Sequence, residues 1–170
     1  MKWSIQQLQS LKDEGLHLNE SVDVQDLKAT DREIREISDV RIQGTGSISR
    51  ELASFTLTIS GTMTLPCART LNDVEYPFSI DAVESFQLSE WATFDKDDDV
   101  HELTNNTVDL MPCVRERILL EKPLRVFSDK PEGPAPKKGD GWELRAEEEK
   151  QQKVDPRLAK LEKYFKNNDE

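Results

Sequence analysis

The stretch Phe55-Thr56-Leu57-Thr58-Ile59-Ser60-Gly61-Thr62-Met63-Thr64-Leu65 decides the fold. Apart from Gly61, large apolar side chains occupy every second position, and hydroxyl-bearing side chains fill the positions between them. Successive side chains of a β-strand point to opposite faces, and threonine suits a pleated surface. The stretch therefore predicts a half-buried strand of an antiparallel sheet, with its other face toward solvent or a partner.

Alternating runs on both sides of this strand predict further strands of the same sheet. The run that follows it comprises Val74, Tyr76, Phe78 and Ile80, continued by Phe86 and Leu88. Because Asn72-Asp73 suits a turn, the two runs predict a hairpin with a loop of several residues. The run that precedes it comprises Val40, Ile42 and Ile48, with Gly44 and Gly46 on the same face. Glycines there indicate a bulge or a close backbone approach.

Helices are predicted near the beginning of the chain and after the sheet. Ile5, Leu8 and Leu11 have helical spacing, and Leu16–Leu18 and Val22–Val24 predict two short strands around a polar turn. Further along, Leu110, Val114 and Ile118 form the apolar stripe of a helix that Pro123 ends. Asp109 is expected as its N-cap or first-turn acid. Together these elements predict an α+β fold, an antiparallel sheet of several strands with a few packed helices.

The composition of the chain changes after Phe127 and again near its C-terminal end, so we distinguish three parts. Residues 1–127 are expected to form the α+β domain, to which 124–127 adds one more strand. Residues 128–153 are rich in proline, glycine and charge and predict a linker. Within it, Trp142 either docks on the domain or anchors a partner. Pro156 suits the first turn of a helix over 154–170, which packs on the domain or awaits a partner because a lone short helix is unstable.

The charge of the chain restricts its partners and its location. The net charge is −11, and 34% of the residues are charged. Since such a chain repels polyphosphate at long range, any contact with RNA requires a local basic patch or a basic protein partner. The first residues contain no apolar run, and no stretch is long enough to cross a membrane. We therefore expect a cytoplasmic protein with reduced thiols and no membrane partner.

Motifs for catalysis or cofactor binding are weak. The chain has two cysteines and two histidines, with no close pair of either, so we expect no metal site. The acidic loop Asp95–Glu102 starts like a calcium loop but lacks the turn glycine, which favours a solvated loop and leaves weak divalent binding open. Cys113 would need a histidine base to be a nucleophile, and the spacing selects neither His17 nor His101. We expect no catalytic residue, no cofactor and no small-molecule substrate.

Five arginines are the candidate contacts for RNA or a partner. Between Val114 and Val126 the chain is net basic, although the whole is acidic. Arginine binds phosphate through paired hydrogen bonds, and on an antiparallel sheet these residues could gather into one patch. The alternative is ordinary surface arginines paired with the many acids. The candidates are Arg50, Arg69, Arg115, Arg117 and Arg125.

Four motifs, in order along the chain, resemble the YceD family. Leu65-Pro66-Cys67-Ala68-Arg69 is similar to the family's Leu-x-Cys-x-Arg strand end, and Val108-Asp109-Leu110, followed by Glu116 and Pro123, to its acid-capped helix. Gly141-Trp142 resembles a feature of a shorter, cysteine-poor branch. The closing motif is Asp155-Pro156-Arg157-Leu158-Ala159-Lys160-Leu161. The residues of these motifs that we expect to be structural are Cys67, Asp109, Glu116, Pro123, Trp142, Asp155, Pro156 and Leu158.

The resemblance implies a non-catalytic factor for the accumulation of large-subunit ribosomal RNA. Its partner would be large-subunit rRNA or a precursor, bound through the local basic patch. An alternative is an acidic module or chaperone that holds a basic large-subunit ribosomal protein. Thr70 stands where many relatives carry a second cysteine, and Ser128–Pro131 replaces a further cysteine pair, so no metal role carries over.

Overall fold

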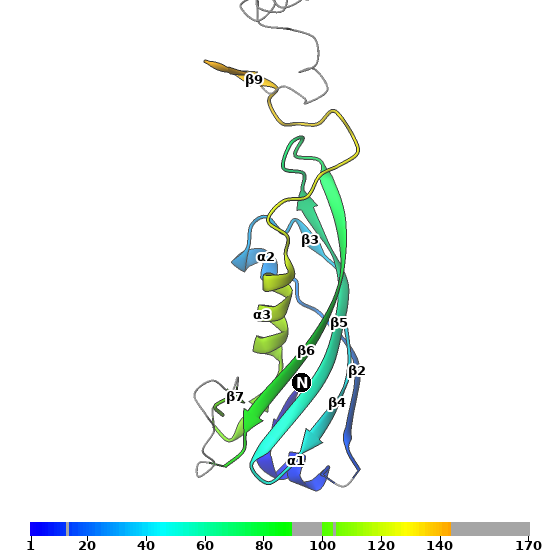
Figure 1. The fold of residues 1–170 in the computed structure, drawn as a ribbon, viewed down its shortest axis with the longest axis vertical. Coiled ribbons are helices and arrows are strands. Elements are labelled where there is room, and N and C mark those ends of the chain that lie inside the picture. Colours follow the sequence, from blue (N-terminus) through cyan, green and yellow to red (C-terminus); the bar gives the residue numbers. More distant parts are fainter. Residues whose placement is uncertain (13, 90–99, 104, 144–170) are drawn as a thin grey trace, which may run out of the picture. The chain divides into compact units, whose positions relative to one another are not determined.

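The computed structural model describes residues 1–12, 14–89, 100–103 and 105–143 of the 170-residue chain. The chain divides into two compact units, Met1–Pro134 and Ala135–Glu170. The larger unit is a twisted sheet with helices on it (Figure 1), which confirms the α+β prediction. In the smaller unit, the described part is a short antiparallel hairpin of β9 (Lys138–Gly139) and β10 (Trp142–Glu143).

The main sheet is built around one long hairpin. Its strands run in the order β2-β4-β5-β6-β7, and the short β3 pairs with β5 off this path. Among the strand pairings that the structure describes in this sheet, β6–β7 is parallel and the others are antiparallel. The strands are β2 (Leu16–Val22), β3 (Glu36–Ile37), β4 (Val40–Ile48), β5 (Leu52–Pro66), β6 (Asp73–Gln87) and β7 (Val100–His101).

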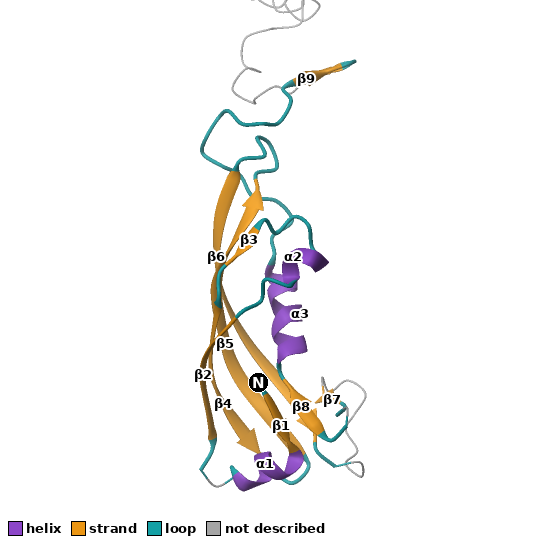
Figure 2. Ribbon diagram, turned by 180° about the vertical axis from the view of Figure 1, so that it is seen from behind, coloured by secondary structure: helices purple, strands orange, loops and turns teal. Residues whose placement is uncertain are grey.

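Helices and a small second sheet cover one face of the main sheet (Figure 2). The small sheet pairs β1 (Lys2–Ser4) with β8 (Thr107–Asp109). The helices are α1 (Ile5–Ser10), α2 (Leu27–Thr30) and α3 (Met111–Glu121), and each buries apolar side chains in the core. Burial of that core supplies the main driving force for folding.

The alternating pattern of β5 sorts its side chains as predicted. Phe55, Leu57 and Ile59 are buried under the helices, whereas Thr56 and Thr58 on the other face are exposed. The glycines of β4 mark a close approach, because β4 pairs with β5 without an extra residue. Gly44 pairs with Leu57 and Gly46 with Phe55, so the large side chains of β5 occupy the space above β4.

Several local expectations differ from the structure. β2 runs unbroken through Leu16–Val22, since β4 pairs with every residue and pulls the polar centre into the sheet. Asp109 lies one residue before the N-cap, Leu110, yet its carboxylate still accepts the Met111 N–H at 3.1 Å. Residues 124–127 add no strand and form a single bridge between Val126 and Cys67.

The first part of the predicted linker, residues 128–143, lies within the described residues. The larger unit includes 128–134, where the Asn72 side chain donates a hydrogen bond to the Glu132 carbonyl at 2.6 Å. The small hairpin interrupts the rest, and its Gly139 leaves room for the ring of Trp142, which is 52% exposed. The predicted helix over 154–170 lies outside the described residues. No helix within the described ranges is long and apolar enough to cross a membrane.

Candidate functional site

The turn of the long hairpin lies beside the segment that follows α3. The Ala68 N–H donates a hydrogen bond to the Val126 carbonyl at 2.9 Å, and Cys67 bridges to Val126. Arg69 and Arg125 are the exposed neighbours of these two contacts. The structure thus brings into contact the two segments that carry Arg69 and Arg125, two of the five candidate arginines, from positions 56 residues apart in the sequence.

Exposed apolar side chains accompany the two arginines. Leu124 is 99% exposed, Phe127 60% and Leu71 40%, and Leu71 adopts a left-handed backbone conformation (φ 59°) that is unusual for leucine. Clustered exposed apolar residues mark an interaction site more often than chance. We call this the turn surface and define it as Arg69, Leu71, Leu124, Arg125 and Phe127. A cavity of about 150 Å³ is lined by three of its members, Leu71, Leu124 and Arg125.

The other three candidate arginines lie elsewhere. Arg50 is in the β4–β5 turn, at the opposite end of the 15-residue β5, which is roughly 50 Å along the strand from Arg69. Arg115 pairs with Asp26 at 2.8 Å, and Arg117 pairs with buried Glu84 at 2.6 Å. Both guanidinium groups are therefore paired with acids of the same chain, and the five arginines do not form one patch.

The sulfur of Cys67 is buried under the turn surface. It accepts the N–H groups of Thr70 at 3.4 Å and Ser128 at 3.3 Å. Burial by itself raises the pKa of the Cys67 thiol, but hydrogen bonds from the Thr70 side chain and from the backbone of Ser128, Thr70 and Arg69 outweigh it and lower the pKa to about 6. Cys67 is fully buried, and its two hydrogen bonds join the turn to the segment after α3.

Cys67 is expected to make stability depend on pH. Its pKa is about 6 in the folded chain against an ordinary 9.0, so the folded state releases this proton first as pH rises. The contribution is complete above about pH 9 and is lost as pH falls through 6. In urea unfolding at pH 6, 7.5 and 9, the free-energy gap between the wild type and Cys67→Ser should widen with pH. An unchanged gap would show that the sulfur stays a thiol.

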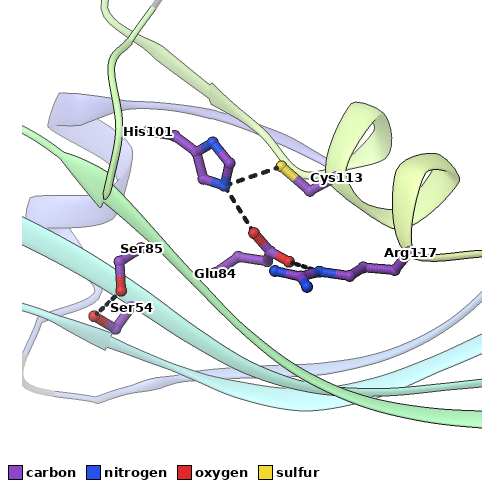
Figure 3. Close-up of polar contacts among 6 residues, drawn as sticks. All are labelled: Ser54, Glu84, Ser85, His101, Cys113 and Arg117. Carbon is purple, nitrogen blue, oxygen red and sulfur yellow. Dashed lines mark hydrogen bonds and ion pairs between the residues drawn. The ribbon is translucent and has the colours of Figure 1, made fainter. Parts of the chain in front are cut away.

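A buried polar cluster lies near the end of β6, between β6, the edge strand β7 and α3 (Figure 3). Glu84 is 2% exposed. One of its carboxylate oxygens contacts His101 Nε2 at 2.7 Å, and the other contacts Arg117 Nε at 2.6 Å. Cys113 Sγ lies 3.7 Å from the same His101 nitrogen. The structure therefore selects His101 as the histidine beside Cys113, a choice that sequence spacing left open.

The cluster does not make Cys113 a reactive thiolate. Burial and, to a smaller extent, the negative charges of Glu84 and Glu116 raise the pKa of the Cys113 thiol to about 11, against a smaller lowering by Arg117. A nucleophilic cysteine requires the opposite, a depressed pKa. The signal that could have located the cluster was Glu84 itself, an acid at a position of β6 that shares the apolar face with Phe78 and Phe86.

Arg117 should stabilise the fold because it neutralises Glu84. Arg117→Leu leaves the buried carboxylate with His101 alone and should cost about 2–3 kcal/mol in urea unfolding. Adding Glu84→Leu should recover at least half of that loss, because no buried charge is then unpaired. Arg115→Leu is the control. Arg115 lies two residues before Arg117 and pairs with exposed Asp26, so its replacement should cost under about 1 kcal/mol. If the double variant lost the sum of the stabilities lost in Glu84→Leu and Arg117→Leu, the pairing of the two side chains would be contradicted.

The remaining residues of the family-like motifs lie near the ends of α3 or outside the described ranges. Asp109 also pairs with Lys2 at 3.1 Å, Glu116 is exposed on α3, and Pro123 follows the helix end at Glu121. Asp155, Pro156 and Leu158 lie outside the described residues, as does the 95–99 part of the acidic loop. Two later residues of the acidic loop, Val100 and His101, form β7 and pair with β6.

Comparison with known proteins places these features in a family context. Residues 55–165 match the model of the family described as "Large ribosomal RNA subunit accumulation protein YceD". The chain is similar to the "Uncharacterized protein YlbN" of Bacillus subtilis (strain 168), with 44% identity over 172 residues. That match covers 100% of this chain and 99% of the relative. No solved structure matches the chain.

Proposed function

The chain belongs to the YceD family, and we propose that it supports the accumulation of large-subunit rRNA by binding precursor rRNA through the turn surface. The family's description names a ribosome-biogenesis role and no reaction. On this proposal the protein acts in the cytoplasm as a binding factor rather than an enzyme. The observation that carries the proposal is the contact, at one end of the sheet, between the segments that hold Arg69 and Arg125, the second of which also carries the exposed ring of Phe127.

The chemistry of the turn surface suits single-stranded or looped RNA. Neither Arg69 nor Arg125 has an ion pair within the described part of the chain, so both guanidinium groups are available for phosphate. Nearby Lys122 differs, because Asp31 and Glu33 both bind it at 2.6 Å. Phe127 offers a face on which an unpaired base can stack. Two local cations reconcile RNA binding with a net charge of −11.

A second candidate is a basic large-subunit ribosomal protein as the direct partner. The observation that favours it is the apolar share of the turn surface, where Leu124 is 99% exposed, together with the acidity of the chain. An acidic chain attracts a basic protein at long range. Capture of the tagged chain with and without nuclease separates the two. A ribosomal protein that survives nuclease treatment supports this candidate, and its loss together with the RNA supports direct rRNA binding.

Removal of the protein from cells tests the function itself. We expect sucrose gradients of cells that lack the chain to show less large-subunit rRNA relative to small-subunit rRNA. The wild-type chain should restore the ratio, and a chain with Arg50→Glu should do so equally. A balanced profile in cells without the protein would overturn the proposed function.

A further inference from the structure

Three atoms that commonly ligate metals converge in the buried cluster of Figure 3. They are a carboxylate oxygen of Glu84, Nε2 of His101 and Sγ of Cys113, and all lie within 4.8 Å of one another. They come from β6, β7 and α3, so only the folded chain assembles them. We propose that Glu84, His101 and Cys113 bind one divalent transition-metal ion, for which Zn²⁺ is the best match.

Two of the three separations lie within about 0.6 Å of those of tetrahedral zinc, and the third, between Glu84 and Cys113, is within 4.8 Å. Zinc bonds of about 2.05 Å to nitrogen and 2.3 Å to sulfur place the two ligand atoms about 3.6 Å apart at the tetrahedral angle. His101 Nε2 and Cys113 Sγ are 3.7 Å apart. Nitrogen and oxygen ligands would be about 3.3 Å apart, whereas His101 Nε2 and Glu84 Oε2 are in hydrogen-bond contact at 2.7 Å. Metal binding replaces that hydrogen bond: Nε2 releases its proton and Nδ1 takes one up, so that the imidazole stays neutral. A rotation of the Glu84 side chain supplies the difference in distance.

Contacts around the three ligands hold them in place. Arg117 binds the other oxygen of Glu84, which leaves Oε2 facing His101 and Cys113. The His101 ring lies 5.0 Å from the Phe86 ring, which limits its rotation. Partners of this kind orient metal ligands in other proteins. The ligand set selects the ion, because thiolate and imidazole favour Zn²⁺, whereas Mg²⁺ and Ca²⁺ prefer oxygen alone.

Binding of the ion releases one proton from Cys113. The ion displaces the thiol proton to solvent, and the thiolate, together with the carboxylate that Arg117 also contacts, offsets most of the charge of the ion. His101 and Cys113 both line a cavity of about 580 Å³. Water from this cavity completes the coordination, an arrangement of three protein ligands and one open position.

Cobalt titration of the full chain, freed of metal by a chelator, tests the proposal. Co²⁺ should bind with a stoichiometry of one and give thiolate-to-cobalt charge-transfer absorption, and Zn²⁺ should displace it. Mg²⁺ and Ca²⁺ should not. The chain supplies a matched control for each variant, since it has two cysteines and two histidines. Cys113→Ser should abolish the charge-transfer band, whereas Cys67→Ser should keep it.

The histidine pair keeps the test decisive if Cys113→Ser does not fold. His101→Gln should weaken Co²⁺ binding by about 100-fold or more, since loss of a ligand should cost at least as much as loss of its supporting partner. His17→Gln, on β2, should leave the affinity unchanged. The proposal is overturned if the wild type gives no charge-transfer band, or if the band survives Cys113→Ser and is lost in Cys67→Ser. Equal affinities for the His101 and His17 variants would overturn it too.

Discussion

Reversal of both arginine charges on the turn surface, in Arg69→Glu/Arg125→Glu, is expected to weaken binding of precursor rRNA by about 100-fold, since each charged contact with phosphate contributes about 1.5 kcal/mol or more. The affinity of the wild type should fall as salt rises, and the variant should show a shallower dependence on salt. Filter binding or fluorescence anisotropy with the full chain at several salt concentrations measures both effects.

Arg50→Glu is the matched control for this prediction. Arg50 is also exposed and lies in the turn at the other end of β5. Arg50→Glu alters the net charge by the same amount as Arg69→Glu, so a general effect of charge would weaken RNA binding equally in both variants. Equal losses for Arg50→Glu and Arg69→Glu would contradict a localised binding surface. Both variants should unfold at wild-type urea concentrations because these side chains are exposed.

Gly44→Ala is expected to destabilise the larger unit by about 3 kcal/mol or more, at the upper end of overpacking effects. A Cβ at position 44 would overlap the backbone oxygen of Thr56 in the neighbouring strand. That oxygen belongs to the β4–β5 pairing, so relief requires the two strands to separate. Elsewhere in a strand, alanine is favoured over glycine by roughly 0.5–1 kcal/mol. The large expected loss thus comes from the close approach alone.

Gly46→Ala, on the same face of β4, is the control for the close approach. A Cβ at Gly46 would meet the Phe55 ring at 3.1 Å and Leu16 Cβ at 3.2 Å, so these neighbours need to move by only a few tenths of an ångström. We expect a loss of about 1 kcal/mol or less in urea unfolding. Equal losses at the two positions would contradict the special role of Gly44. Before urea is added, the circular dichroism spectrum of each variant should show the same sheet content as the wild type.

The sheet was predictable because its patterning is local. The alternation from Phe55 to Leu65 assigns a face to every residue, and the second alternating run completes the hairpin. Such periods survive folding because a one-residue slip would expose every apolar side chain of the strand. The unbroken β2 was missed because its centre, Asn19-Glu20-Ser21, is polar and strand pairing with β4 overrides local preference.

The candidate sites were less predictable because they depend on contacts distant in sequence. No sequence pattern around Arg69 or Arg125 indicates that a bridge between Cys67 and Val126 joins their segments. His101 and Cys113 come together only because β7 pairs in parallel with the end of β6. A charged residue on an apolar strand face, as at Glu84, is the local sign that a buried partner exists.

Crosslinking in cells tests the central claim, contact between the turn surface and precursor rRNA, most directly. Ultraviolet crosslinking of the full chain, followed by identification of the crosslinked peptides, should recover large-subunit rRNA joined to peptides that contain Arg69 or the segment Leu124–Phe127. Arg69→Glu/Arg125→Glu should remove that signal. Recovery of no rRNA above background, or of peptides from the β4–β5 turn around Arg50 instead, would contradict the claim.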